Sequence, residues 1–497
     1  MRWFCAQIGA REHYAIPRAL LSAGRPVMLC TDFWAGPAIR GVWEQSRKLK
    51  WENRNGKAIS VLCSLAARHN PELEIKRKLE SRDQSAEIIS WNWRALWWEM
   101  VKKAERGNAK EERRKQKAEK RELKEDHGPQ ATDHKTAGAS QLSTFSVSAF
   151  SPYAGFIEVG RRFAIRVREE LKRRADPGAD AIFFAYDTGA LEALEWCREQ
   201  GIKTILNQMD PNRVEVELVQ AEEKQWPGWA LNPVQVPGVY FARREKEWAL
   251  ADRVVVNSEF SRQALLQQGV PAEKLVVVPL CFEAKTENRK QNTKPNAAEG
   301  QNQFQLSTFQ VSASSPLRFL FLGQVILRKG IQYLLQAAKL LEKEPVHFDV
   351  VGPVGISQEA MATAPGNVTF HGRAGRDQAA AWYQRSHVFV LPTLSDGFAL
   401  TQLEAMAYGR PVVTTPCCGD VVTDGVDGFV VPARDAAGLA RSFQRYLAEP
   451  ELLKKQSAAA LVKAGQFTVS RLAANLMKLE AELTKQGVES RKQKTES

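Results

Sequence analysis

The chain has few cysteines and no long apolar run, and both features narrow the class of protein. Its seven cysteines among 497 residues form no C-x-x-C pair and show no metal-ligand spacing, so we expect a reduced, cytoplasmic protein without a structural metal site. No apolar run approaches the roughly 18 to 20 residues that a membrane-spanning helix needs. The apolar start, residues 1–9, is too short for a signal peptide and predicts a first strand.

Positive charge is in excess, with a formal net charge of +13. Much of it comes from two stretches, Lys102–Lys124 and Arg161–Arg174. Such an excess steers anionic ligands, binds nucleic acid or contacts an anionic membrane, and solvated helix faces are the plainer alternative. The basic residues do not alternate with aromatic ones on a recognisable motif, so we expect no nucleic-acid partner.

Tryptophans precede the first basic stretch at helical spacing, notably Trp93 and Trp97. Aromatic residues next to a Lys/Arg run are typical of a helix that lies on a membrane surface. A tryptophan stripe buried in a core is the alternative. The sequence therefore leaves two hypotheses for this segment, peripheral contact with the inner face of an anionic membrane or packing inside the protein.

The length and the 44% hydrophobic content accommodate two domains, each with its own core. We place the first domain at residues 1–282 and the second at residues 317–468. Residues 100–152 are predicted to be a charged, low-complexity insert, and residues 283–316 a polar linker. Both segments end on nearly the same sequence, QLSTFSVSAFSP and QLSTFQVSASSP, to which we assign no catalytic role.

A strand, a tight turn and a helix start follow one another in the second domain. The apolar strand Val388–Leu391 ends in a turn of Pro, Ser, Asp and Gly, and helical spacing begins near Ala399 or Leu400. Such a turn presents backbone N–H groups and the positive end of a helix dipole, which favour a phosphate. Asp396 and Glu404 bracket the turn, and carboxylates repel phosphate. We therefore expect them to hold hydroxyls, such as those of sugar and ribose on either side of a diphosphate. A turn that serves packing alone is the alternative.

A second glycine-rich turn lies upstream in the same domain. The strand Leu317–Leu322 leads into GQVILRKG, residues 323–330, and a helical pattern follows. Arg328 and Lys329 precede the glycine that opens this helix, so they can reach an anion at the carboxyl end of the strand. Charge-assisted contacts to a phosphate contribute about 1.5 to 3 kcal/mol each.

Together these residues resemble glycosyltransferase family 4, the retaining, nucleotide-sugar-dependent enzymes of the GT-B fold. The family's two carboxylates, which have seven residues between them, fall on Asp396 and Glu404, and its Lys-Gly pair falls on Lys329 and Gly330. The sequence departs from the family in two places: the first carboxylate is usually Glu, and Gln324 replaces an arginine often found after the first glycine. Two downstream segments are also similar to the family, Ala405–Val413 and Asp424–Val431.

The resemblance implies an α/β fold of GT-B architecture, in which two Rossmann-like domains face a cleft and carry low-complexity inserts. It also implies that a C-terminal helix, residues 469–486, packs back across the cleft, and we expect a disordered tail at residues 487–497.

The activity implied by the resemblance is transfer of a sugar from a nucleoside diphosphate sugar to an acceptor, with retention of anomeric configuration. We expect no cofactor besides this donor, and no metal, because the sequence has no convincing acidic metal triplet. Members of the family act on glycans, lipids or small molecules. Two alternatives stay open: an inverting transferase that uses His13 or an aspartate as base, and a nucleotide-sugar-binding protein without turnover.

The candidate site residues fall into three groups. The predicted catalytic residues are Asp396, Lys329, Arg328, His13 and Asp210. The predicted donor-binding residues are Gly323, Gln324, Arg328, Lys329, Arg373, Asp396, Gly397, Phe398, Ala399, Leu400 and Glu404. The predicted acceptor-side residues are Gly9, His13 and Asp187, because they follow strands of the first domain, where ligands meet an open sheet. Met209 stands where the family often has a histidine.

Overall fold

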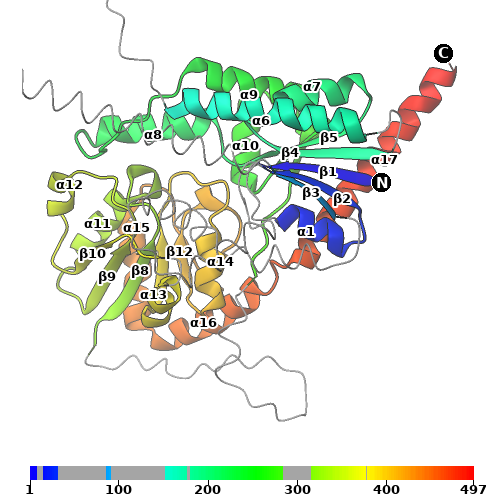
Figure 1. Ribbon diagram of the computed structural model, residues 1–497. Helices are drawn as coiled ribbons and strands as arrows, with labels where there is room; N and C mark the ends of the chain where they lie inside the picture. Colours follow the sequence, from blue (N-terminus) through cyan, green and yellow to red (C-terminus); the bar gives the residue numbers. More distant parts are fainter. Residues whose placement is uncertain are drawn as a thin grey trace, which may run out of the picture.

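The computed structural model describes residues 1–7, 15–31, 86–90, 152–175, 180–283, 315–375 and 378–496. These residues form two α/β domains, each built on one parallel sheet (Figure 1). In the part of the chain that the structure describes, no helix is both long and apolar enough to cross a membrane.

The N-terminal sheet has seven parallel strands in the order β3-β2-β1-β4-β5-β6-β7. From β1 the chain adds strands first on one side of the sheet, β2 and β3, and then on the other side, starting with β4. This change of side is typical of a doubly wound sheet, in which ligands bind at the carboxyl ends of the strands. The central strand β4 is buried along its whole length, as its continuous apolar run AIFFAY predicts. The strands are β1 Arg2–Gln7, β2 Val27–Thr31, β3 Ala86–Ser90, β4 Ala181–Tyr186, β5 Lys203–Gln208, β6 Arg253–Val256 and β7 Leu275–Val277.

Helices cover both faces of this sheet, and each face has its own apolar core. One core contains Val167 of α6, Leu194 of α7, Trp248 of α9 and Leu265 of α10. The opposite core contains Leu20 of α1 together with leucines of the C-terminal helix α17. The helices are α1 Ala15–Ser22, α6 Pro152–Arg174, α7 Leu191–Glu199, α8 Arg213–Gln225, α9 Gly238–Leu250, α10 Glu259–Gln267 and the 3-10 turn η4 Ala272–Lys274.

The C-terminal sheet repeats this plan with six parallel strands in the order β10-β9-β8-β11-β12-β13. Helices α11 and α15 cover one face, and α13, α14 and α16 cover the other. The strands are β8 Leu317–Leu322, β9 Val346–Val351, β10 Val368–Gly372, β11 Val388–Leu391, β12 Val412–Thr414 and β13 Gly428–Val430. The helices are α11 Ile331–Leu340, α12 Gln358–Ala362, α13 Ala379–Arg385, α14 Leu400–Ala407, α15 Ala436–Ala448, α16 Pro450–Ala464, η6 Leu327–Lys329 and η7 Pro416–Cys418. The predicted architecture of two Rossmann-like domains is therefore confirmed.

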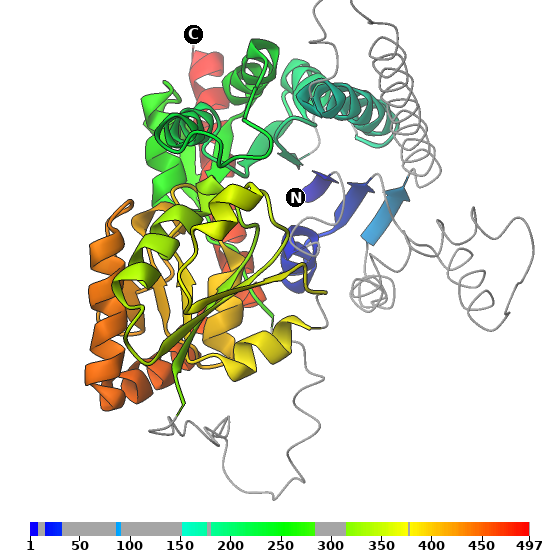
Figure 2. The same ribbon diagram turned by 90° about the vertical axis from the view of Figure 1, so that its left-hand side faces the viewer.

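The last helix, α17 (Val469–Glu496), leaves the C-terminal domain and runs along the N-terminal one (Figures 1 and 2). Its Leu476 and Leu479 lie in the core beneath β1, and the Trp3 indole N–H donates to Glu480 Oε2 at 2.7 Å. We predicted a disordered tail at residues 487–497, whereas the structure describes α17 as a helix as far as Glu496. After Gly487 the sequence has no proline and is rich in good helix formers, so nothing local ends the helix.

Helix α8 belongs to the N-terminal domain by sequence but docks on the C-terminal domain. Its buried Glu222 accepts from Gln332 Nε2 at 2.9 Å, from the Tyr333 hydroxyl at 2.8 Å and from Arg434 Nε at 2.6 Å. Just beyond α8, Trp226 and Trp229 pack against the C-terminal core. The two domains are thereby joined by a buried carboxylate and two tryptophans.

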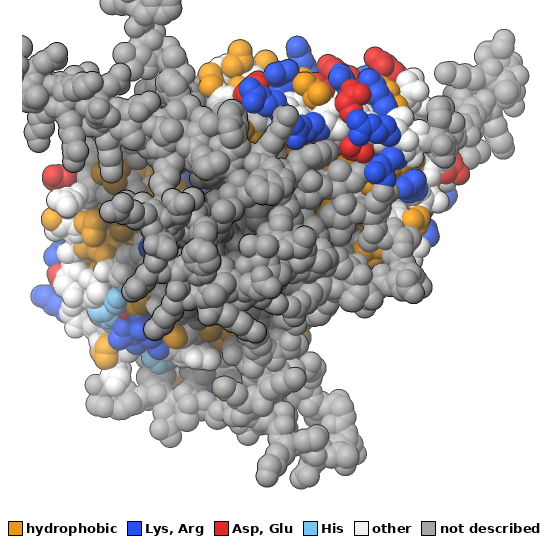
Figure 3. Space-filling model, viewed as in Figure 1, with side chains coloured by type: hydrophobic (Ala, Val, Ile, Leu, Met, Phe, Trp, Pro, Cys, Tyr) orange, Lys and Arg blue, Asp and Glu red, His pale blue; other side chains and the backbone are white. Residues whose placement is uncertain are grey.

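The basic stretch Arg161–Arg174 lies on α6, where its cations pair within the helix with Glu158, Glu169 and Glu170. Figure 3 shows Lys and Arg side chains next to Asp and Glu over the upper part of the molecule, where α6 and α9 lie. This arrangement fits a solvated helix face, the plainest interpretation of the basic stretch. The other basic stretch, the tryptophan-rich segment and residues 284–314 of the linker lie outside the described residues.

Candidate active site

The turn after β11 is held between two short 3-10 turns. The Leu394 N–H and the Thr393 hydroxyl donate to the carbonyl of Arg328 in η6, at 2.8 and 3.1 Å. On the other side, the Asp396 N–H donates to the carbonyl of Cys417 in η7 at 2.8 Å. These backbone contacts fix the turn before any ligand binds.

Gly330 brings the second motif against this turn. Its φ is +74°, and a Cβ atom there would lie 1.8 Å from the Pro392 carbonyl oxygen, so only glycine fits without displacement. As a result Lys329 Nζ donates to Asp396 Oδ2, and both side chains are mostly buried. The two motifs predicted from separate stretches of sequence thus meet as one ion pair.

Glu404 lies in the second turn of α14, where its Oε2 accepts from the Tyr383 hydroxyl at 2.8 Å. Ala399 is the residue before α14, and its N–H donates to the Cys418 carbonyl at 3.3 Å. That N–H is therefore already engaged, although we predicted that it would face a ligand. Phe398 is buried and packs against Phe467, with ring centroids 6.0 Å apart, so its side chain supports the turn.

The turn also touches the N-terminal domain. A Cβ atom on Gly397 would lie 2.0 Å from the Met209 carbonyl oxygen and 3.6 Å from Asp210 Cα. Gly397 therefore packs against the carboxyl end of β5, and the Lys329–Asp396 pair lies one residue along the chain from this contact with Asp210. The structure brings together four of the five predicted catalytic residues, Asp210, Arg328, Lys329 and Asp396.

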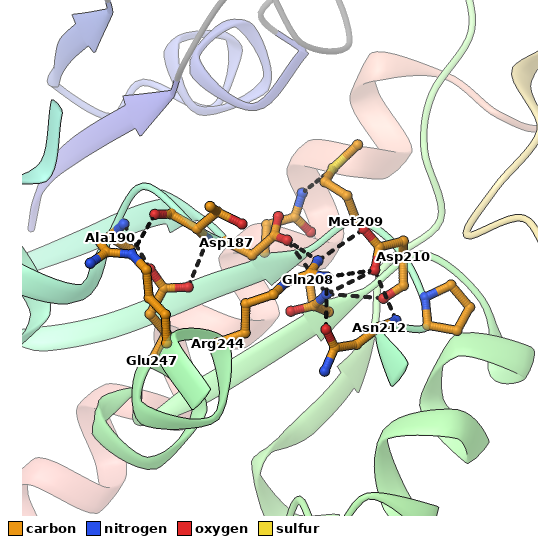
Figure 4. A network of polar contacts seen from close by, with 12 residues as sticks. Asp187, Ala190, Gln208, Met209, Asp210, Asn212, Arg244 and Glu247 are labelled. Carbon is orange, nitrogen blue, oxygen red and sulfur yellow. Dashed lines mark hydrogen bonds and ion pairs between the residues drawn. The ribbon is translucent and has the colours of Figure 1, made fainter. Parts of the chain in front are cut away.

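Asp210 and Asp187 are bridged by a residue that the sequence did not indicate, the buried Arg244 of α9 (Figure 4). Arg244 donates to both carboxylate oxygens of Asp210 at 2.9 Å, to Asn212 Oδ1 at 2.8 Å and to Asp187 Oδ2. Burial raises the pKa of Asp210, but the charge and hydrogen bonds of Arg244 outweigh it and leave the pKa below its ordinary value. Asp187 is buried, and its carboxylate accepts from Arg244. It is therefore not on the surface, where we predicted a contact with the acceptor.

The guanidinium of Arg328 lies where α8 of the N-terminal domain contacts the C-terminal domain. Its Nη1 donates to the Ser395 carbonyl at 2.9 Å and lies 3.4 Å from Glu215 Oε2 of α8. The Ser395 hydroxyl also donates to Glu215 Oε2, at 2.7 Å. Burial raises the pKa of Glu215. Glu215 and Arg244 are the polar residues that the sequence reasoning missed, since both lie on helices whose partners are far away in sequence.

The remaining predicted residues are distributed as follows. Gly323 follows β8, and its N–H donates to the Val351 carbonyl at 2.9 Å, while the side chains of Gln324 and Arg373 are exposed. Leu400 begins α14. Gly9 and His13 lie outside the described residues, so their assignment stays a prediction. Among the residues that the structure describes, no three His, Cys, Asp or Glu side chains are grouped to hold a metal ion.

Part of the sequence is similar to known glycosyltransferases. Residues 316–449 match the family described as Glycosyl transferases group 1. D-inositol 3-phosphate glycosyltransferases are among the similar proteins. The one from Streptomyces griseus is 33% identical over 166 residues, which are 30% of this chain and 35% of the relative. The one from Frankia alni is 32% identical over 177 residues, which are 32% of this chain and 44% of the relative. The matched part thus spans less than half the length of these relatives.

Solved structures match the whole fold. Sucrose-phosphate synthase from Thermosynechococcus elongatus has a TM-score of 0.51 at 16% identity, and the match covers 97% of this chain and 99% of that one. A glycosyltransferase from Rickettsia africae has a TM-score of 0.50 at 13% identity, and the match covers 97% of this chain and 98% of that one. Two facing Rossmann-like domains crossed by a C-terminal helix define the GT-B class of fold. The match to the family described as Glycosyl transferases group 1 lies within the C-terminal domain.

Proposed function

We propose that the protein transfers a sugar from a nucleoside diphosphate sugar to a hydroxyl acceptor, with retention of anomeric configuration and without a metal ion. The observation that carries this proposal is the Lys329–Asp396 pair, which lies next to the start of α14 and one residue along the chain from the contact of Gly397 with Asp210 of the other domain. Retention and metal independence rest on the family resemblance and on the sequence.

The chemistry requires that the negative charge growing on the departing diphosphate be stabilised in place. Lys329 supplies a cation, and the N-terminal end of α14 supplies the positive end of a helix dipole. Asp396 accepts a hydroxyl of the donor sugar, and Glu404 accepts hydroxyls of the nucleotide ribose. Arg328, held by Glu215 and Ser395, aligns η6 and with it Lys329.

The proposal is tested by incubating the protein with UDP-, GDP- and ADP-sugars and measuring released nucleoside diphosphate. We expect release from one donor, a loss of about 100-fold or more in kcat in Lys329→Ala, and a rise in KM for the donor in Glu404→Ala, since a group that holds the ribose acts alike in ground and transition states. Lys339→Ala is the matched control, because Lys339 is an exposed lysine paired with Glu342 on the far end of α11. Absence of donor binding in the wild-type protein would overturn the proposed site.

Stereochemistry, metal dependence and turnover each need a separate measurement. The anomeric configuration of the product, read by NMR, separates retention from inversion. Activity that is unchanged by EDTA supports metal independence, whereas a loss restored by a divalent cation contradicts it. Donor binding without release in the presence of glycan, lipid and small-molecule acceptors would favour the alternative, a nucleotide-sugar-binding protein without turnover.

A further inference from the structure

We propose that Tyr383 is the residue that orients Glu404 toward the ribose of the bound nucleotide. The proposal rests on the proposed function and adds to it a positioning residue outside the two motifs. It starts from the hydrogen bond of 2.8 Å between the Tyr383 hydroxyl and Glu404 Oε2.

The ring of Tyr383 is fixed in place. It is 1% exposed and stacks on Tyr408, with ring centroids 5.4 Å apart and planes 16° from parallel. On another side it contacts Phe389 of β11, with centroids 6.0 Å apart. The position of the Tyr383 hydroxyl is therefore fixed, because α13 packs on the sheet beside α14.

The pair also matches in hydrogen-bonding chemistry. An ionised carboxylate accepts hydrogen bonds only, and a protonated phenol can donate one. Burial and the negative charge of Glu404 raise the pKa of Tyr383 well above its ordinary value, so the phenol stays a donor at working pH. The Tyr383 hydroxyl therefore stays a hydrogen-bond donor to Glu404 Oε2.

The consequence concerns the plane of the carboxylate. A free glutamate rotates about its last torsion, which is broad. Fixing one oxygen fixes this rotation, and the other oxygen then has a defined direction relative to the turn after β11. Orienting a binding group through a second residue commonly contributes tenfold or more in affinity, as the partners of metal ligands show at about 10- to 100-fold.

Tyr383→Phe removes the hydroxyl and keeps the ring in its stack. We expect it to weaken binding of the cognate nucleoside diphosphate about tenfold, which corresponds to about 1.4 kcal/mol. We also expect KM for the donor to rise by a similar factor and kcat to change less than about twofold, since a group that holds the ribose acts alike in ground and transition states. Tyr446→Phe is the control, because it removes a buried hydroxyl of the same domain that donates to the uncharged Gln456.

The decisive readout is titration calorimetry with UDP, GDP and ADP and with their 2′,3′-dideoxy counterparts. The wild-type protein and Tyr446→Phe should bind the ribose form of one nucleotide more tightly than its dideoxy form. In Tyr383→Phe most of this preference should disappear, while affinity for the dideoxy form stays at the wild-type value. Equal weakening for both forms, or an unchanged preference, would overturn the positioning role and leave the proposed function standing. Absence of nucleotide binding in the wild-type protein would overturn both.

Discussion

Gly397 is the residue at which the two domains touch at the candidate site. A methyl group there would lie 2.0 Å from the Met209 carbonyl oxygen, a backbone atom that cannot rotate away. Gly397→Ala must therefore shift the turn or open the junction, and either change separates Asp396 from Asp210.

We expect Gly397→Ala to lower kcat/KM about 10- to 100-fold, because a displacement of about 1 Å is costly in catalysis. Donor kinetics measure the effect. Gly366→Ala is the matched control, since no atom lies within 4 Å of a Cβ there. Activity equal to wild type would mean that the active form does not use this closed junction.

At the scale of elements, α8 acts as a bridge between the domains. Its Glu222 is fully buried and accepts hydrogen bonds from three side chains of the C-terminal domain. Among the described residues of α8, no other side chain accepts three such bonds. Removing its carboxylate deprives Arg434 and Tyr333 of this acceptor, whereas Gln332 keeps its hydrogen bond to the Leu327 carbonyl. The Arg434 side chain is 40% exposed, so water can solvate its charge, and the main cost is the lost hydrogen bonding of the buried donors, about 1 to 3 kcal/mol.

Glu222→Ala should therefore loosen α8 from the C-terminal domain. Hydrogen exchange should quicken in α8 and stay unchanged in β1 and β4. Glu217→Ala is the control, because Glu217 lies on the exposed side of the same helix. If Glu222→Ala leaves exchange in α8 at the wild-type rate, the carboxylate does not hold the bridge.

The two motifs of the C-terminal domain were predictable because their signals are local. Glycines, a strand and a helical spacing lie within a few residues of each other, and the parallel order of β8 and β11 then brings Lys329 to Asp396. The partners of Arg244 and Glu222 were not predictable, because they lie between 32 and 212 residues away in sequence. A charged residue on a helix looks the same from sequence whether it faces water or a distant carboxylate. The end of α17 is difficult to predict for a related reason, since a polar segment without a helix breaker is compatible with both helix and disorder.

At the scale of the whole molecule, α17 makes the N-terminal domain depend on the end of the chain. Leu476 is fully buried in the core formed with Trp3 and Leu20, although these residues are more than 450 positions apart. Glu480 adds a hydrogen bond from Trp3 and an ion pair with Arg25 at 2.6 Å. This face of the N-terminal sheet is thus completed by a helix that follows the C-terminal domain.

Leu476→Ala should consequently destabilise the N-terminal domain by about 2 to 5 kcal/mol, the usual cost of a cavity left by a buried leucine. Hydrogen exchange should quicken in β1 and α1 and remain slow in β8 and β11, because the C-terminal cores contain no residue of α17. Lys478→Ala, an exposed position on the same helix, should leave both domains unchanged. Equal quickening in both sheets would show instead that the domains unfold as one unit, with the bridge of α8 and the crossing of α17 coupling them.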